Sequence, residues 1–235
     1  TNSTGSTTKA SAAVAARLKA AGFTNDDIFL GGAAENKGNI VARLKGSGKR
    51  KPLLLLAHLD VVEAPRVDWT TDPFKFEEID GYYYARGSSD DKAMASIFVA
   101  NMIRMKKEKF MPDRDIIMAL TADEEGGDHN GVDWLLKNHK DLIDAEYALN
   151  EGGRGQEQNG KKILNQVQLS EKVFNSFTLE VVNKGGHSSQ PRKDNAIYAM
   201  ARALENLDNF DFPVNLNEGT RVYFERSSKI ETGQL

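Results

Sequence analysis

The sequence contains no cysteine. This absence excludes disulfide bonds, thiolate metal sites and a cysteine nucleophile. The chain also lacks an apolar run long enough to span a membrane, and it shows no signal peptide. It has 31 basic and 34 acidic residues, a net charge of −3 and no long basic run. We therefore expect neither a nucleic acid nor a membrane as a partner.

The compartment stays open, because both cytoplasmic and exported (periplasmic or secreted) proteins can lack cysteine. The first residue is Thr1 rather than Met, and we expect the N-terminus to be incomplete. With 235 residues, 40% of them hydrophobic, the chain can bury a sizeable core. This length suits one large domain, or one domain with part of a second.

Apolar patterns predict alternating strands and helices over residues 1–171. Continuous apolar runs, typical of strands covered on both faces, occupy residues 52–57, 115–121 and 146–150. Shorter strands are predicted at residues 39–44 and 82–85. Amphipathic helices are predicted at residues 6–21, 91–107 and 132–138. This alternation favours an α/β fold, a three-layer sandwich with a mostly parallel central sheet.

The pattern changes near Lys172. Residues 174–182 alternate between apolar and polar, as a half-solvated strand does. A helix is predicted at residues 195–207 and another alternating strand at residues 221–226. We therefore expect two domains, residues 1–171 and the start of a smaller α+β lid or dimerisation domain at residues 172–235.

Metal-ligating residue types follow each of the three buried strands. They are His58 and Asp60, then Asp123, Glu124 and Glu125, then Glu151. In open α/β sheets, ligands bind outside the carboxyl ends of the strands. Asp90 lies in a tight turn before the predicted helix at residues 91–107. Converging carboxylates repel one another, and a buried unpaired charge is costly, so the sequence predicts a two-metal centre.

Taken singly, these acids also have simpler interpretations. Asp90 suits the N-cap of the helix that follows it. Glu124 and Glu125 suit the first turn of a helix, where acids face the positive end of its dipole. Only the combination of strand-end acids with His58 favours a metal centre over these alternatives.

Spacing suggests how the residues divide the work. His58 supplies a nitrogen ligand, and Asp60, two residues on, can accept the other imidazole N–H. Asp90 carries two oxygens and can bridge two metals. Of the neighbours Glu124 and Glu125, one can ligate while the other takes a proton. Imidazole and carboxylate ligands without thiolates suit Zn²⁺, with Co²⁺ or Mn²⁺ as substitutes.

Five motifs in register across the chain resemble the co-catalytic di-zinc metallopeptidases, the family of glutamate carboxypeptidase, aminoacylase and dipeptidases. They are His58-Leu59-Asp60, Arg86-Gly87-Ser88-Ser89-Asp90-Asp91-Lys92, Asp123-Glu124-Glu125, Asn150-Glu151-Gly152-Gly153 and Lys184-Gly185-Gly186-His187-Ser188-Ser189-Gln190-Pro191. The resemblance implies a zinc-exopeptidase fold with two Zn²⁺ per site. It implies the metal ligands His58, Asp90, Glu125 and Glu151, with Asp90 bridging.

The same resemblance implies the remaining roles. Glu124 is the expected general base, and Asp60 the residue that orients His58. His187, in the lid domain, is the expected substrate-binding residue. The peptide bond between Asp90 and Asp91 is expected to be cis.

The resemblance therefore implies a zinc-dependent hydrolase of the carboxypeptidase, dipeptidase or aminoacylase type. Such an enzyme cleaves peptide or N-acyl amide bonds next to a free carboxylate by metal-activated water. The expected substrate is a small peptide or an N-acyl amino acid. A homodimer formed through the lid domain is also implied.

The sequence departs from the family pattern at its end. Family members are longer, and after the lid their chain returns to the catalytic domain and supplies one further His ligand. No His follows His187 in this sequence, so we expect a fragment of a longer enzyme. The alternative is a truncated or degenerate, non-catalytic metal- or peptide-binding module that lacks the last ligand.

Overall fold

The structure, a computed structural model, describes residues 5–169 and 171–230. The chain divides into two compact units, Thr1–Glu151 and Gly152–Leu235. The outer ends of the two expected domains, residues 1–4 and 231–235, and residue 170 near their boundary lie outside the described residues. The expected domain boundary at residue 172 stays a prediction.

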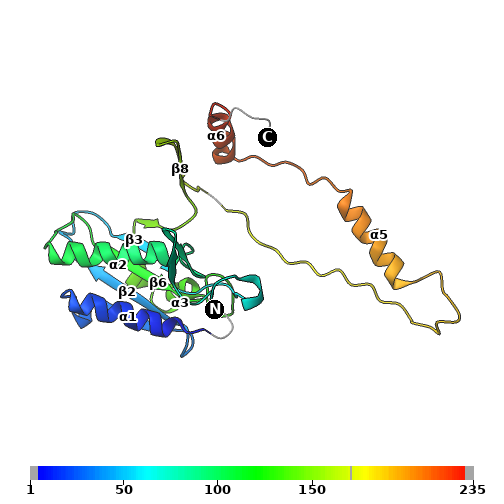
Figure 1. The fold of residues 1–235 in the computed structure, drawn as a ribbon, viewed down its shortest axis with the longest axis horizontal. Helices are drawn as coiled ribbons and strands as arrows, with labels where there is room; N and C mark the ends of the chain where they lie inside the picture. The colour runs from blue at the N-terminus through cyan, green and yellow to red at the C-terminus, as the bar shows by residue number, and fades with distance from the viewer. Residues whose placement is uncertain (1–4, 170, 231–235) are drawn as a thin grey trace. The chain divides into compact units, whose positions relative to one another are not determined.

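The first unit is built on a five-stranded sheet with the order β1-β2-β6-β3-β7 (Figure 1). Its strands are β1 (Ile28–Gly32), β2 (Gly38–Leu44), β3 (Leu53–His58), β6 (Ile116–Thr121) and β7 (Tyr147–Leu149). Strand β3 pairs in parallel with β6 and with β7, and β2 pairs antiparallel with β1 and β6. Only β2 therefore runs against the other strands of this sheet. The expected mostly parallel sheet is confirmed.

Helices cover both faces of this sheet. On one face, α1 (Thr7–Ala20) and α2 (Lys92–Lys107) bury Leu18 and Met102 against Met118 and Leu120 of β6. On the other face, α3 (Gly131–Asn138) and α4 (Lys140–Ile143) pack on the residues of β6 that alternate with those two. Because side chains alternate along a strand, β6 contributes side chains to the cores on both faces of the sheet. All its residues are buried. The result is the expected three-layer sandwich.

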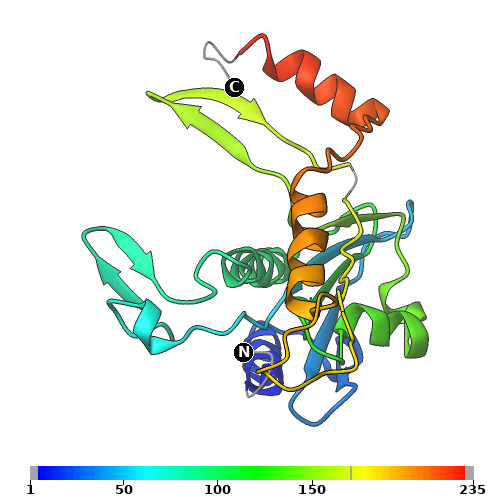
Figure 2. The same ribbon diagram turned by 90° about the vertical axis from the view of Figure 1, so that its right-hand side faces the viewer.

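A long connection leads from β3 to α2. It contains the 3₁₀ turn η2 (Arg66–Asp68) and a hairpin of β4 (Glu77–Ile79) with β5 (Tyr82–Tyr84), which stands apart from the main sheet in Figure 2. The two turn residues, Asp80 and Gly81, have φ values of 52° and 82°. An Asp-Gly pair with positive φ is the preferred two-residue hairpin turn. A second 3₁₀ turn, η1 (Asn25–Asp27), precedes β1.

The described residues of the second unit form a hairpin and two helices. They are β8 (Gly155–Gln158), β9 (Lys161–Asn165), α5 (Ala196–Asp208) and α6 (Glu218–Ser227). The predicted helix at residues 195–207 is confirmed by α5. The predicted strand at residues 221–226 is wrong, because this segment lies within α6. The Asn217 side chain accepts the Thr220 N–H at 2.8 Å and caps this helix.

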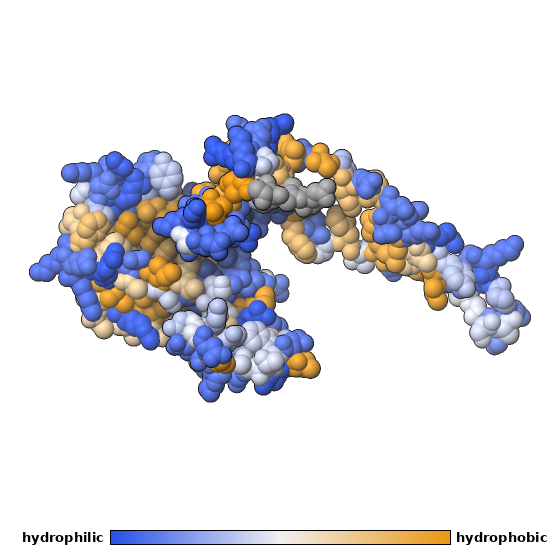
Figure 3. Space-filling model, turned by 45° about the horizontal axis from the view of Figure 1, so that its top comes forward, coloured by the Kyte–Doolittle hydropathy of each residue, from blue (hydrophilic) through white to orange (hydrophobic). Residues whose placement is uncertain are grey.

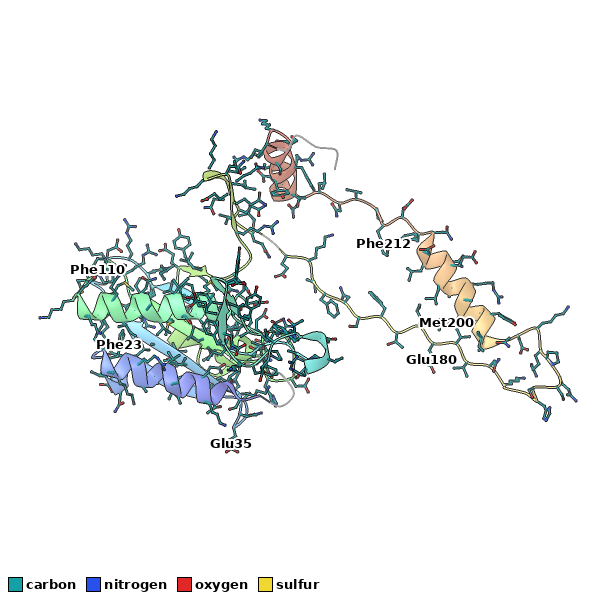
Figure 4. All side chains as sticks on the ribbon, in the orientation of Figure 1. Phe23, Glu35, Phe110, Glu180, Met200 and Phe212 are labelled. Atoms are coloured by element: carbon teal, nitrogen blue, oxygen red, sulfur yellow. The ribbon has the colours of Figure 1, made fainter. Side chains whose placement is uncertain are left out.

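The predicted strand at residues 174–182 is also wrong. These residues have no regular secondary structure and no paired strand, and their side chains are exposed, as Figure 4 shows around Glu180. Phe174 and Phe177 are 86% and 88% exposed, and apolar groups lie on the surface of this part of the chain in Figure 3. Alternating apolar and polar residues form a strand only where a neighbouring strand pairs with them and a core buries their apolar face. No described helix is long and apolar enough to cross a membrane.

Candidate metal centre

The parallel pairing of β3 and β6 brings their carboxyl ends to one edge of the sheet. His58, the last residue of β3, is in register with Thr121, the last of β6. The Leu59 N–H donates to the Thr121 carbonyl at 2.8 Å and extends this pairing by one residue. Asp60 and Glu124 therefore leave the sheet at the same edge, as the strand-end pattern predicted.

Three carboxylates converge on one nitrogen of His58, whose side chain is only 2% exposed. The Nε2 atom lies 3.0 Å from Oδ1 of Asp90, 3.8 Å from Oε2 of Glu124 and 3.7 Å from Oε1 of Glu151. These acids come from the turn before α2 and from the loops after β6 and β7. The structure thus brings together candidate residues that are far apart in the sequence.

Asp60 holds two parts of the centre at once. Its carboxylate accepts the backbone N–H groups of Glu124 at 3.1 Å and Glu125 at 3.0 Å. The Nδ1 atom of His58 lies 3.2 Å from the Asp60 backbone carbonyl and 3.5 Å from the carboxylate Oδ1. The contact with the loop after β6 was not foreseen from the sequence. The expected role of Asp60 in orienting His58 stays a prediction.

The turn before α2 presents two consecutive acids in different ways. The Asp90–Asp91 peptide bond is cis, which confirms the expectation drawn from the resemblance. Asp91 occupies the N-cap position and is buried, and its Oδ2 accepts the His58 N–H at 3.2 Å. Asp90 remains exposed and faces the His58 ring. Its simpler interpretation as a helix cap is therefore wrong.

The simpler interpretation of Glu124 and Glu125 is wrong as well. The next helix, α3, begins only at Gly131, and its cap is Asn130, whose Oδ1 accepts two backbone N–H groups. Glu124 and Glu125 therefore lie in a loop, outside the first turn of any described helix. Their carboxylates belong to the cluster around His58 instead.

The charges of this cluster perturb one another. Burial on its own lowers the pKa of His58, but the hydrogen bond and charge of Asp60, with Asp90 and Glu124 nearby, outweigh it and raise the pKa to about 9. Burial, with the charge of Asp90, raises the pKa of Glu125. Burial, with the charge of Asp91, raises the pKa of Glu151. The crowded carboxylates thus favour a bound cation, which would offset their repulsion.

The donor set fits a zinc-type ion. Two groups of three residues each place one ligand atom per residue within 4.8 Å of one another: His58 with Glu124 and Glu151, and His58 with Asp90 and Glu125. Nitrogen and oxygen donors without thiolates suit Zn²⁺, and three protein ligands leave a position open for water or substrate. Both groups contain His58. Because one ring nitrogen binds one ion, the two groups cannot both be filled through the His58 Nε2.

Four polar residues to which the sequence analysis gave no supporting role contact the candidate residues or the backbone next to them. They are Lys37, Asn39, Asp91 and Asn130. Lys37 directly precedes β2 and Asn39 is the second residue of this strand, and both side chains are buried. An asparagine at the start of a mostly apolar predicted strand was the signal for Asn39, and no local pattern marks Lys37 as buried.

His187 belongs to the second unit and is exposed. Its Nδ1 lies 2.8 Å from the Ser189 hydroxyl and accepts the Ser189 N–H at 3.2 Å. Local contacts thus fix the ring orientation within the turn at residues 187–190. The expected role of His187 in binding substrate stays a prediction.

Comparison with known proteins gives a consistent result. The family described as peptidase family M20/M25/M40 matches residues 54–223. The human N-fatty-acyl-amino acid synthase/hydrolase PM20D1 is 32% identical over 177 residues, which cover 73% of this chain and 35% of the relative. A probable carboxypeptidase S-like 2 from Dictyostelium discoideum is 33% identical over 188 residues, 74% of this chain and 35% of the relative. The chain therefore spans about a third of these curated relatives.

A solved structure is also similar. The M20 family metallo-carboxypeptidase Sso-CP2 from Sulfolobus solfataricus aligns with a TM-score of 0.49 at 21% sequence identity. The alignment covers 61% of this chain and 31% of that chain.

Proposed function

The chain belongs to the peptidase family M20/M25/M40, and on that premise we propose that it is a zinc-dependent hydrolase of peptide or N-acyl amide bonds next to a free carboxylate. Members of this family are metal-dependent hydrolytic enzymes. The observation that carries the proposal is the convergence of Asp90, Glu124 and Glu151 on Nε2 of His58. A buried imidazole among acids is the donor set that such an enzyme needs.

The ligand roles follow the resemblance and agree with the distances. His58, Asp90, Glu125 and Glu151 would hold two zinc ions, with Asp90 as the bridging carboxylate. Support comes from His58, Asp90 and Glu125, whose ligand atoms lie within 4.8 Å of one another. The Oε1 atom of Glu151 lies 3.7 Å from the His58 Nε2. Bound zinc supplies Lewis-acid polarisation of the scissile carbonyl and a water of lowered pKa.

Glu124 is the proposed general base. Its carboxylate is 45% exposed and lies 3.8 Å from the His58 ring, so it is at the centre and open to solvent. Its Oε2 would take a proton from the attacking water and deliver it to the nitrogen of the leaving amine. The backbone of Glu124 is held by Asp60, so the base is carried by a fixed loop.

The substrate is proposed to be a small peptide or an N-acyl amino acid. This class agrees with the names of two relatives, an N-fatty-acyl-amino acid synthase/hydrolase and a probable carboxypeptidase. His187 is the proposed residue for the substrate carbonyl or carboxylate, and residues 172–235 are the proposed homodimer surface.

Turnover by the Glu124→Gln variant tests the proposal. The full chain, loaded with Zn²⁺, is assayed on dipeptides and on N-acyl amino acids by release of the free amine. Loss of a general base should lower kcat by about 10²- to 10⁴-fold. Glu35→Gln, at an exposed glutamate in the same unit, is the matched control and should keep wild-type activity.

Two results would contradict the proposal. One is the absence of zinc-dependent turnover on every substrate tested. The other is a Glu124→Gln variant as active as the wild type. Zinc binding without turnover would instead favour the non-catalytic binding module.

A further inference from the structure

A buried ion pair lies directly behind the metal centre. The Lys37 Nζ atom is 2.5 Å from Oδ1 of Asp123, and the two side chains are only 6% and 1% exposed. The partners are 86 residues apart in the sequence. Removing an ammonium and a carboxylate from water is costly unless each has a close partner. The position of each side chain is therefore tightly tied to the other.

Asp123 lies where the chain turns from β6 into the loop that carries Glu124 and Glu125, which we call the acidic loop. Its φ is 53°, in the left-handed region that Asp and Asn tolerate better than most residues. The next two residues are Glu124 and Glu125, the proposed base and a proposed ligand. Any change in the backbone at Asp123 would thus move both carboxylates.

Further polar contacts fix the same turn. The Ala122 N–H donates to Oδ1 of Asn39 at 2.9 Å, and the Asn130 Nδ2 donates to the Asp123 carbonyl at 3.2 Å. Gly127 passes so close to the Asp123 side chain that a Cβ there would lie 2.6 Å from its Oδ2. The Asp123 carboxylate is therefore confined between Lys37 and the returning loop.

We propose that Lys37 is a positioning residue of the metal centre, and that its ion pair with Asp123 sets the backbone on which Glu124 and Glu125 stand. Lys37 directly precedes β2 and Asp60 follows β3, so two separate segments of the chain hold residues 123–125. This inference rests on the proposed function for the roles of Glu124 and Glu125. The geometry itself does not depend on turnover.

The test compares Lys37→Met with Lys106→Met in the full chain. Lys106 forms a less buried pair with Asp27 at 3.4 Å, outside the acidic loop, and serves as the matched control. In the metal-free protein, amide hydrogen exchange at Glu124 and Glu125 should be about tenfold faster in Lys37→Met, while exchange in β3 matches the control. Titration with Co²⁺ should show an affinity about 10- to 100-fold weaker and a changed visible spectrum.

The outcome that overturns the proposal is equally specific. In Lys37→Met, amide exchange at Glu124 and Glu125 would rise no more than exchange in β3 does, and the Co²⁺ spectrum would be unchanged. If Lys37→Met does not fold, Lys37→Gln is measured by the same criteria, because it removes the ammonium charge of the ion pair while keeping a polar group in the buried space. Both readouts work without hydrolysis, so an inactive chain would contradict the proposed function and leave this test intact.

Discussion

At the scale of single residues, His58 is the most strongly perturbed group of the centre. Its imidazole is almost fully buried, and its pKa is raised to about 9 by Asp60 and by the neighbouring acids, against the effect of burial. In the metal-free protein the ring therefore carries a proton at neutral pH. A histidine that binds a metal must be neutral, so protons and metal ions would compete for this side chain in the proposed centre.

The stability of the metal-free protein should therefore fall as the pH rises from about 6.5 to 9. The pKa of His58 is higher in the folded chain than its ordinary value of 6.5, so folding favours the protonated ring. This stabilisation is complete below pH 6.5 and is lost as the pH rises through 9. Urea denaturation in the presence of a chelator, repeated across this range, measures it.

His58→Asn should remove this part of the pH dependence. His129→Asn, at an exposed histidine of the same unit, is the control and should behave as the wild type. A wild-type protein and a His58→Asn variant with the same slope between pH 6.5 and 9 would refute the interpretation. Other groups titrate as well, so the difference between the two proteins is the quantity that decides.

Residue types and spacing predicted the members of the cluster but not what supports them. Ligand-type residues at strand ends are visible in the sequence, because parallel strands bring their carboxyl ends together. The supporting contacts are different. The Lys37–Asp123 pair and the two hydrogen bonds from the acidic loop to Asp60 join distant segments, and no local pattern encodes them.

At the scale of elements, β6 is the strand on which both helical layers are packed. Ile117 is fully buried in the layer with α3 and α4, and its neighbour Met118 is fully buried in the layer with α1 and α2. The strand ends directly before the loop that carries Glu124. Packing of β6 therefore supports the metal centre as well as the fold.

Ile117→Ala should destabilise the protein by about 2–5 kcal/mol, since it removes buried apolar contacts and leaves a cavity. Ile97→Ala is the matched control, because Ile97 is 57% exposed on α2, and it should change stability by about 0.5 kcal/mol or less. Urea denaturation of both variants gives the comparison. Equal losses of stability would show that β6 is not the packing centre.

The buried elements of the first unit were predictable because their apolar patterns are strong. The predicted strands at residues 52–57 and 115–121 match β3 and β6 within one residue at each end. The failures lie in the second unit, where none of the described residues is buried. Residues 221–226 alternate like a strand, but the Asn217 cap and the absence of a described partner strand leave them helical.

At the scale of the whole molecule, the candidate ligands are all contained in the first unit. His58, Asp90, Glu125 and Glu151 precede the division at Gly152. The second unit holds the proposed substrate residue His187 and has a long exposed stretch without regular secondary structure at residues 171–186. The proposed metal ligands and the proposed substrate residue thus belong to different units.

Limited trypsin digestion should cut first at Lys172 and Lys184, which are exposed and outside regular secondary structure. Lys107 is also exposed but lies in α2, and it should resist longer. Mass spectrometry of the early fragments identifies the order of cleavage. We expect the resulting N-terminal fragment to retain Co²⁺ binding. Early cleavage at Lys107, or loss of binding on cleavage after Lys172, would contradict this view of the units.

The spread of the centre along the chain has a consequence for how quickly it forms. Lys37 meets Asp123 across 86 residues, and Asp60 meets Glu124 across 64. Closing such long loops costs chain entropy before any stabilising contact forms. Proteins rich in contacts between distant residues therefore fold slowly. The acidic cluster should therefore be among the last parts to assemble during refolding, after β3 and β6 have paired. A metal ion added early would then meet scattered side chains rather than a site.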